Sequence, residues 1–119
     1  MNDKDLAIKR NNTARLFQFT DKSHRNDIRI NINNSFEHEL AKFIISWNLK
    51  KEGKEFITEA TFENRLGRAD IVILDNSEII EILETEELVD AKKKELKYPL
   101  PIRFIRARGI LKDVVEVNL

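Results

Sequence analysis

Cysteine is absent from these 119 residues, and histidine occurs only twice, as His24 and His38. The missing thiol excludes disulfides, thiolate zinc sites and a cysteine nucleophile. With two imidazoles, a histidine-rich metal site is not expected. Gly-rich phosphate loops and Ser-His-Asp arrangements are also missing, which argues against NTPases and acyl-transfer hydrolases.

The sequence has no excess of charge and no long apolar run. Its 21 basic and 21 acidic residues cancel, so any binding to nucleic acid must come from local basic patches. No apolar run approaches the roughly 20 residues of a bilayer span, and the polar N-terminal residues do not resemble a signal peptide. We therefore expect a soluble cytoplasmic protein without a membrane partner, folded as a single globular domain.

Residues 1–34 are expected to form an N-terminal basic arm or short hairpin, ahead of a compact domain at 35–119. The first 30 residues hold seven Lys or Arg and four Asp. Residues 1 to about 14 lack periodicity, and the alternation at 16–19 and 28–32 predicts two short strands. Such an arm either contacts phosphates or is a solvated tail.

A helix is predicted over 36–52, because Asn34 or Ser35 can cap its start and Gly53 can stop it. Its helically spaced apolar residues, expected to be buried, are Phe36, Leu40, Phe43, Ile44 and Trp47. Glu39 falls within this stripe, either buried or reaching solvent at its edge. The neighbouring His38 is expected on the surface, about 100° further round the helix.

Strands are predicted at 55–62, 68–74 and 78–84, a second helix at 86–97 and a fourth strand at 102–107. A fifth strand at 111–117 is also compatible with the pattern. Tyr98-Pro99-Leu100-Pro101 ends the second helix, since proline cannot continue it. A helical connection between strands of one sheet requires at least one parallel pair. The predicted class is α/β, with a mixed sheet.

Two of these apolar strands each carry one acid where a hydrophobic residue would pack better, Asp70 in one and Glu81 in the next. A carboxylate buried in a strand is costly unless it is paired, hydrogen-bonded or bound to a metal. With a two-residue turn, Val72 faces Glu81 and Asp70 faces Leu83, so the acids are diagonal neighbours on one face. A different turn length would shift this register. The arrangement indicates a divalent-cation site and phosphodiester chemistry.

The order helix–strand–strand–strand–helix–strand, with Arg68-Ala69-Asp70 opening one strand and Glu81 in the next, resembles the PD-(D/E)XK nuclease superfamily. Small archaeal Holliday-junction resolvases and restriction-type nucleases are the most similar members, over roughly residues 35–107. The resemblance implies a restriction-endonuclease-like three-layer core, with a central mixed sheet flanked by helices. It also implies Mg²⁺ or Mn²⁺ bound by Asp70, Glu81, the backbone carbonyl of Ile82 and Glu39. In that family the ion activates the attacking water and stabilises the transition state.

One departure from the family concerns its lysine, which belongs two residues after the acid, where this chain has Leu83. Lys92 and Lys93 are candidates for a migrated lysine, or they form a solvated helix face. Glu59 is either a further ligand or faces solvent. Arg68 contacts a phosphate or pairs with an acid. The basic residues that can form a nucleic-acid surface are Arg68, Lys92, Lys93, Arg103 and Arg106.

Three functions remain open. The first is a metal-dependent endodeoxyribonuclease acting on DNA, structure-selective and homodimeric like small resolvases, with RNA as an open alternative. The second is a catalytically impaired nuclease fold that binds nucleic acid or a protein partner, which the leucine at position 83 favours. The third is a small α/β interaction protein in which basic residues pair with the strand acids.

Overall fold

The computed structural model describes residues 1–118, and the side chains of all of these except 94, 95 and 113–118. From residue 36 onward the elements follow the predicted order α-β-β-β-α-β. They are α3 (Phe36–Lys51), β1 (Phe56–Thr61), β2 (Arg68–Ile73), β3 (Glu78–Leu83), α4 (Leu88–Ala91) with the 3₁₀ helix η1 (Lys92–Leu96), and β4 (Ile102–Arg106). Three further helices are α1 (Asp3–Ala14), α2 (Phe19–Lys22) and α5 (Ala107–Asn118).

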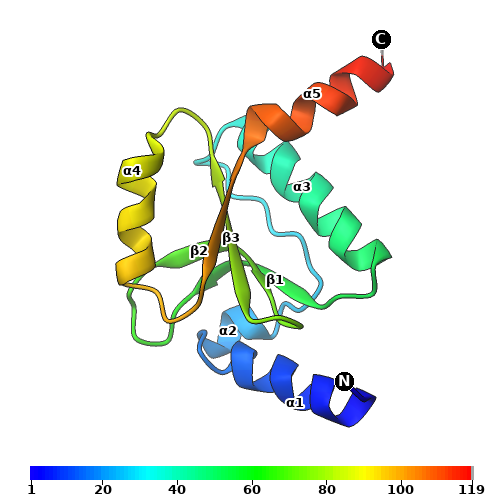
Figure 1. Cartoon of the computed structure of the whole chain (residues 1–119), viewed down its shortest axis with the longest axis vertical. Coiled ribbons are helices and arrows are strands. Elements are labelled where there is room, and N and C mark those ends of the chain that lie inside the picture. The colour runs from blue at the N-terminus through cyan, green and yellow to red at the C-terminus, as the bar shows by residue number, and fades with distance from the viewer. Residues whose placement is uncertain (119) are drawn as a thin grey trace.

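The four strands form one open mixed sheet in the order β1-β2-β3-β4. β1 pairs antiparallel with β2 and β2 with β3, whereas β3 and β4 are parallel and are joined through α4 and η1. The expected parallel pair and the α/β class are therefore confirmed. Helices α3 and α5 lie on one side of the sheet and α4 on the other (Figure 1).

The pairing of β2 with β3 corrects the predicted register. Ile71 pairs with Ile80 and Ile73 with Glu78, so four residues rather than two form the turn. The register is thereby shifted by two residues, and an even shift keeps every side chain on its face of the sheet. The pairing ends at Ile71 and Ile80, and Asp70 and Glu81 are the next residues of the two strands beyond that pair.

Hydrophobic side chains fill both faces of the sheet. On one face Ala41, Ile45 and Leu49 of α3 pack with the buried isoleucines of β2 and β3. On the other face the ring of Phe62 packs between those of Phe17 and Tyr98 at tilted angles, with ring centroids 4.6 Å apart in both pairs. The sheet is therefore buried on both sides, as expected when helices cover both faces.

The predicted buried face of α3 is wrong. The exposed fractions of Phe36, Phe43 and Trp47 are 76%, 46% and 57%. The face toward the sheet instead includes the polar residues His38 and Lys42, which are buried together with Ala41, Ile45 and Leu49. The helix has two apolar stripes, and the one with the smaller residues packs on the sheet because its polar members find charged partners there.

The N-terminal predictions also need correction. Residues 3–14 form α1, whose Arg10 guanidinium donates to both carboxylate oxygens of Asp75 in the β2–β3 turn, each at 2.9 Å. Neither 16–19 nor 28–32 is a strand, and only an isolated bridge joins Phe17 to Phe62.

The predicted fifth strand is also wrong, because residues 111–117 belong to α5. None of the described helices is long and apolar enough to cross a membrane.

Residues 26–34, here called the strap, cover the outer edge of β1. The Asn26 amide N–H donates to the Phe56 carbonyl at 2.7 Å, and the Arg29 guanidinium donates to the carbonyls of Thr58 and Glu59. These contacts satisfy backbone groups that an exposed edge strand would offer to other chains. The strap also brings Asn31 against the sheet, beside the acids considered below.

Candidate functional site

The candidate site lies where β2 and β3 stop pairing through their backbones. Beyond the Ile71–Ile80 pair, side chains take over as hydrogen-bond acceptors. The Asp70 carboxylate accepts from the Ile82 N–H at 2.8 Å, and the Glu81 carboxylate accepts from the Asp70 N–H at 3.3 Å. The two strands are therefore linked by the acids themselves, which fixes both carboxyl groups at the opening between the strands.

Asp70 and Glu81 form a close pair of acids. The Glu81 residue is 2% exposed, and the Asp70 side chain is 17% exposed. Burial favours the neutral form of Asp70, but hydrogen bonds from His38, from Glu81 and from the Ile82 amide outweigh it and lower the pKa of Asp70. Two carboxylates this close repel each other unless a proton or a cation lies between them. Either a proton or a cation between the two carboxylates would relieve this repulsion.

His38, predicted at the surface, is buried and joins this pair to a second cluster of charges. Its Nδ1 lies 2.9 Å from the Glu39 carboxylate and its Nε2 lies 3.4 Å from the Asp70 carboxylate. Burial opposes the imidazolium charge, but Asp70 and then Glu39 outweigh burial and raise the pKa of His38 to about 9. The protonated imidazole therefore holds Asp70 in place from the α3 side.

Lys42 is the second buried cation of the site. Its Nζ lies 2.8 Å from the Glu39 carboxylate and 3.1 Å from the Glu59 carboxylate, and it also donates to the Arg29 carbonyl. A buried ammonium is tolerated only with such partners. The Glu39 carboxylate accepts in addition from the Asn31 N–H. Glu39 is accordingly engaged on all sides rather than open to solvent, and its pKa is lowered, because these donors outweigh the effect of burial.

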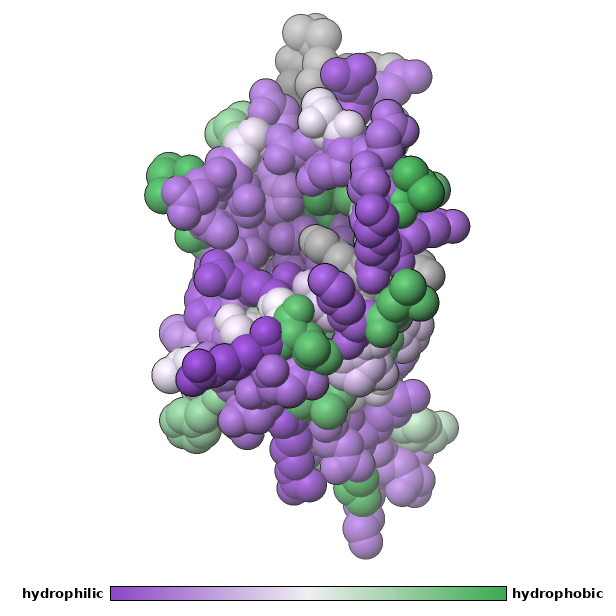
Figure 2. All heavy atoms as spheres, turned by 90° about the vertical axis from the view of Figure 1, so that its left-hand side faces the viewer, coloured by the Kyte–Doolittle hydropathy of each residue, from purple (hydrophilic) through white to green (hydrophobic). Residues whose placement is uncertain are grey.

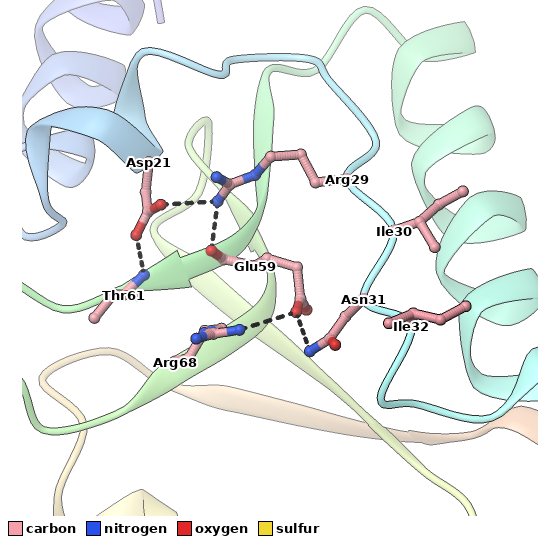
Figure 3. Close-up of a pocket in the computed structure, with 8 residues that line it drawn as sticks. All are labelled: Asp21, Arg29, Ile30, Asn31, Ile32, Glu59, Thr61 and Arg68. Carbon is pink, nitrogen blue, oxygen red and sulfur yellow. Dashed lines mark hydrogen bonds and ion pairs between the residues drawn. The ribbon is translucent and has the colours of Figure 1, made fainter.

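Glu59 lies at the outer end of this series, on the wall of a pocket of about 400 Å³ (Figure 3). Its backbone has a φ of 50°, in the left-handed region. Its carboxylate accepts from the Asn31 side chain at 2.8 Å and lies 3.5 Å from the guanidinium of Arg68. Arg68 thus pairs with an acid, one of its two predicted roles. Its side chain remains 57% exposed at the pocket rim.

The four predicted metal ligands are only partly brought together. Asp70 and Glu81 are adjacent and the Ile82 amide points to Asp70, whereas Glu39 is separated from Asp70 by the His38 ring. Among the residues that the structure describes, no three His, Asp or Glu side chains converge on one point suitable for a metal. Two carboxylates still fit Mg²⁺, which is commonly bound through one or two of them plus waters and substrate phosphates.

The remaining predicted residues lie on several elements. Leu83 is buried at the end of β3, and Lys92 and Lys93 are exposed on η1. On β4, Arg103 pairs with Glu78 at 2.8 Å, and Arg106 donates to the carbonyl of Glu84 at 3.1 Å.

Sequence reasoning did not identify His38, Lys42 and Asn31 as members of the site. A signal for the first two existed, because His38 and Lys42 are spaced i, i+4 and share a helix face with Ile45 and Leu49. The more hydrophobic stripe beside them concealed it. Asn31 carries no such signal, since its place depends on the path of the strap.

Comparisons with models of protein families, with curated proteins and with solved structures give no match to this chain.

Proposed function

We propose that this chain is a PD-(D/E)XK-type nuclease that cleaves DNA phosphodiester bonds with one Mg²⁺ or Mn²⁺ bound by Asp70 and Glu81. The observation that carries the proposal is the contact between these two acids at the opening between β2 and β3. The α-β-β-β-α-β order and the mixed sheet support a restriction-endonuclease-like core. The shielding of Glu39 by its own donors leaves it a structural role in this proposal rather than that of a ligand.

The chain's own residues have distinct tasks in this proposal. A bound ion supplies an activated water and offsets negative charge on the phosphate. Asp70 and Glu81 hold that ion, and His38 fixes the orientation of Asp70 from behind. In this proposal Arg68, two residues before Asp70 and exposed at the start of β2, contacts a backbone phosphate.

A second function is favoured by Leu83, which is buried and cannot orient a water where the family has lysine. Lys42 does not orient a water in place of that lysine, because its ammonium already donates to two carboxylates and a carbonyl. In this alternative the same fold binds DNA or RNA without cutting it. The two functions differ in catalysis and not in the surface used.

Cleavage assays separate the two functions. Labelled duplex, single-stranded and four-way-junction DNA are incubated with Mg²⁺ or Mn²⁺ and with the wild type or Asp70→Asn. Asp90→Asn, at an exposed acid in α4, is the control. A nuclease cuts at least one substrate, loses the activity in Asp70→Asn and keeps it in Asp90→Asn. No cutting of any substrate, with salt-sensitive retardation on a native gel, would favour the binding function.

A further inference from the structure

The outer face of α3 carries a continuous row of apolar side chains, here called the outer stripe. It consists of Phe36, Leu40, Phe43, Ile44 and Trp47. Phe36, Phe43 and Trp47 are exposed, and the rings of Phe43 and Trp47 stack with centroids 6.2 Å apart. The sheet occupies the opposite face of the helix, so nothing in the sheet or its core requires aromatic residues here.

The strap extends this surface. Figure 3 shows Arg29 and Asn31 turned toward the strands and Ile30 and Ile32 turned the other way, toward α3. Ile30 and Ile32 are 77% and 90% exposed. Between the strap and the first half of α3 lies a groove of about 550 Å³. Its apolar lining consists of Ile28, Ile30, Ile32, Phe36, Leu40 and Phe43.

The size of this surface matches one side of a protein interface. At roughly 200 Å² per aromatic residue and slightly less per isoleucine, the exposed fractions leave about 600 Å² of apolar surface. That equals or exceeds the largest patch on a typical monomer, and stable interfaces bury about 800 Å² per partner. On the face that carries α4, by contrast, hydrophobic residues are scattered among hydrophilic ones (Figure 2).

Shape and charge make the surface complementary to itself. The groove lies at the N-terminal half of α3, and the projecting Trp47 lies in the C-terminal half. The two ends of α3 also carry exposed charges of opposite sign, Glu37 in the first turn and Lys51 in the last. When two such helices pack antiparallel, each Trp47 meets the other copy's groove, and each Glu37 lies at the level of the other copy's Lys51.

We propose that two copies of this chain associate through the outer stripe and the strap, with their α3 helices antiparallel about a two-fold axis. Such an interface uses the same patch on both subunits and closes on itself. Asp70 and Glu81 do not line the groove, whereas Glu39, which lies between His38 and Lys42, does. The proposed metal ligands are therefore outside the contact, and the association is tested separately from DNA cleavage.

Sedimentation of the full chain over a range of concentrations tests the association. The wild type is expected to be a dimer, and Trp47→Glu is expected to raise the dimer dissociation constant about 30-fold or more, as for a central interface aromatic. Leu96→Glu, at an equally apolar and more exposed position on η1, is the control and should leave it unchanged. A monomeric wild type, or a dimer indifferent to Trp47→Glu, would overturn the proposal.

Cross-linking tests the arrangement, because the natural chain offers no competing thiol. In this register Trp47 lies nearly level with Leu40 of the other copy, whereas positions 40 and 47 of one helix lie about 10 Å apart, too far for a bond within a chain. The double variant Leu40→Cys/Trp47→Cys should therefore give covalent dimers on mild oxidation, while Leu96→Cys should not. A dimer that both variants cross-link equally, or that neither cross-links, contradicts the antiparallel packing.

Discussion

Titratable side chains form one series of contacts between α3 and the sheet. It runs from Glu59 through Lys42, Glu39 and His38 to Asp70, and the hydrogen bond from the Asp70 amide leads on to Glu81. Each cation of the series lies between two carboxylates, and this attraction offsets the cost of burying the charged groups. The metal is proposed at the end of this series, on the Asp70–Glu81 pair.

Lys42→Met tests the charge balance of this series. Removing the ammonium leaves Glu39 and Glu59 buried without their common cation, and we expect a loss of about 3–5 kcal/mol in the free energy of unfolding. Lys50→Met, at an exposed lysine of the same helix, should change it by less than about 0.5 kcal/mol. Urea titrations of both variants measure the difference, and equal losses would contradict the assigned role of Lys42.

The raised pKa of His38 predicts a dependence of stability on pH. The imidazolium is favoured in the folded state, so its contribution is complete below about pH 6.5, the pKa in the unfolded chain, and is lost as pH rises through about 9. The wild type should lose up to about 3 kcal/mol between pH 6 and pH 9.5 through this group. His38→Gln should lack this component in the same urea titrations. An identical pH dependence in the variant would argue against a charged His38.

The pairing of Asp70 with Glu81 could be predicted from sequence because each acid interrupts an apolar strand. The partners on α3 could not, because the exposed Phe43 and Trp47 give the helix a stronger apolar stripe than the one that is buried. Hydropathy compares the exposed and the buried stripe of α3 by their amino-acid composition alone. Which stripe faces the sheet depends also on whether its polar members meet complementary charges, and that is decided in three dimensions.

Among the elements, the start of β2 is held by a tight contact. Gly67 has a φ of 153°, and a Cβ placed there would lie 2.5 Å from the hydroxyl oxygen of Tyr98. Tyr98 packs in turn on Phe62 and donates to the Arg68 carbonyl at 3.4 Å. The segment after η1 thereby positions the strand that carries Asp70.

Gly67→Ala tests this contact. Both the backbone conformation and the clash with Tyr98 are unfavourable to alanine, so we expect a loss of about 1–3 kcal/mol. Gly109→Ala is the matched control, since its Cβ meets no atom within 4 Å and the residue is helical. The control should be neutral or stabilising by up to about 1 kcal/mol. Thermal unfolding of both variants measures these differences in stability. A Gly67→Ala variant as stable as the wild type would contradict the contact.

Elements with an apolar pattern could be predicted and polar ones could not. The predicted bounds of α3 and of all four strands agree with the structure within about two residues, because apolar periodicity and clear end signals determine them. α1 has no apolar face to reveal it. It is stabilised by the Asn2 side chain at its N-terminus and by Arg10, whose partner Asp75 is 65 residues away.

At the scale of the whole molecule, α1 holds the β2–β3 turn in place, here called the α1 clamp, at the end of the sheet away from α5 (Figure 1). Arg10 donates two hydrogen bonds to Asp75, and the Thr13 and Ser77 hydroxyls lie 2.7 Å apart. The Arg10 hydrogen bond and charge outweigh burial and lower the pKa of Asp75. The N-terminal residues are thus part of the fold, whereas composition alone favoured a basic arm.

Arg10→Ala tests the clamp. It leaves the partly buried Asp75 without its main partner, and we expect a loss of about 1–3 kcal/mol together with faster tryptic cleavage at Lys9 and Arg15. Arg10→Lys, which keeps the charge without the paired geometry, should lie between this variant and the wild type. Unchanged cleavage rates in Arg10→Ala would indicate that α1 is held by other contacts.

Direct titration of the protein with Mn²⁺ by calorimetry tests the proposed metal site without requiring a substrate. We expect one ion per chain, weaker binding as pH falls because carboxylate ligands bind a metal ion only when deprotonated, and loss of binding in Asp70→Asn and Glu81→Gln. Asp90→Asn should bind like the wild type. Absence of Mn²⁺ binding in the wild type, or binding that persists unchanged in both site variants, would contradict the assignment of Asp70 and Glu81 as metal ligands.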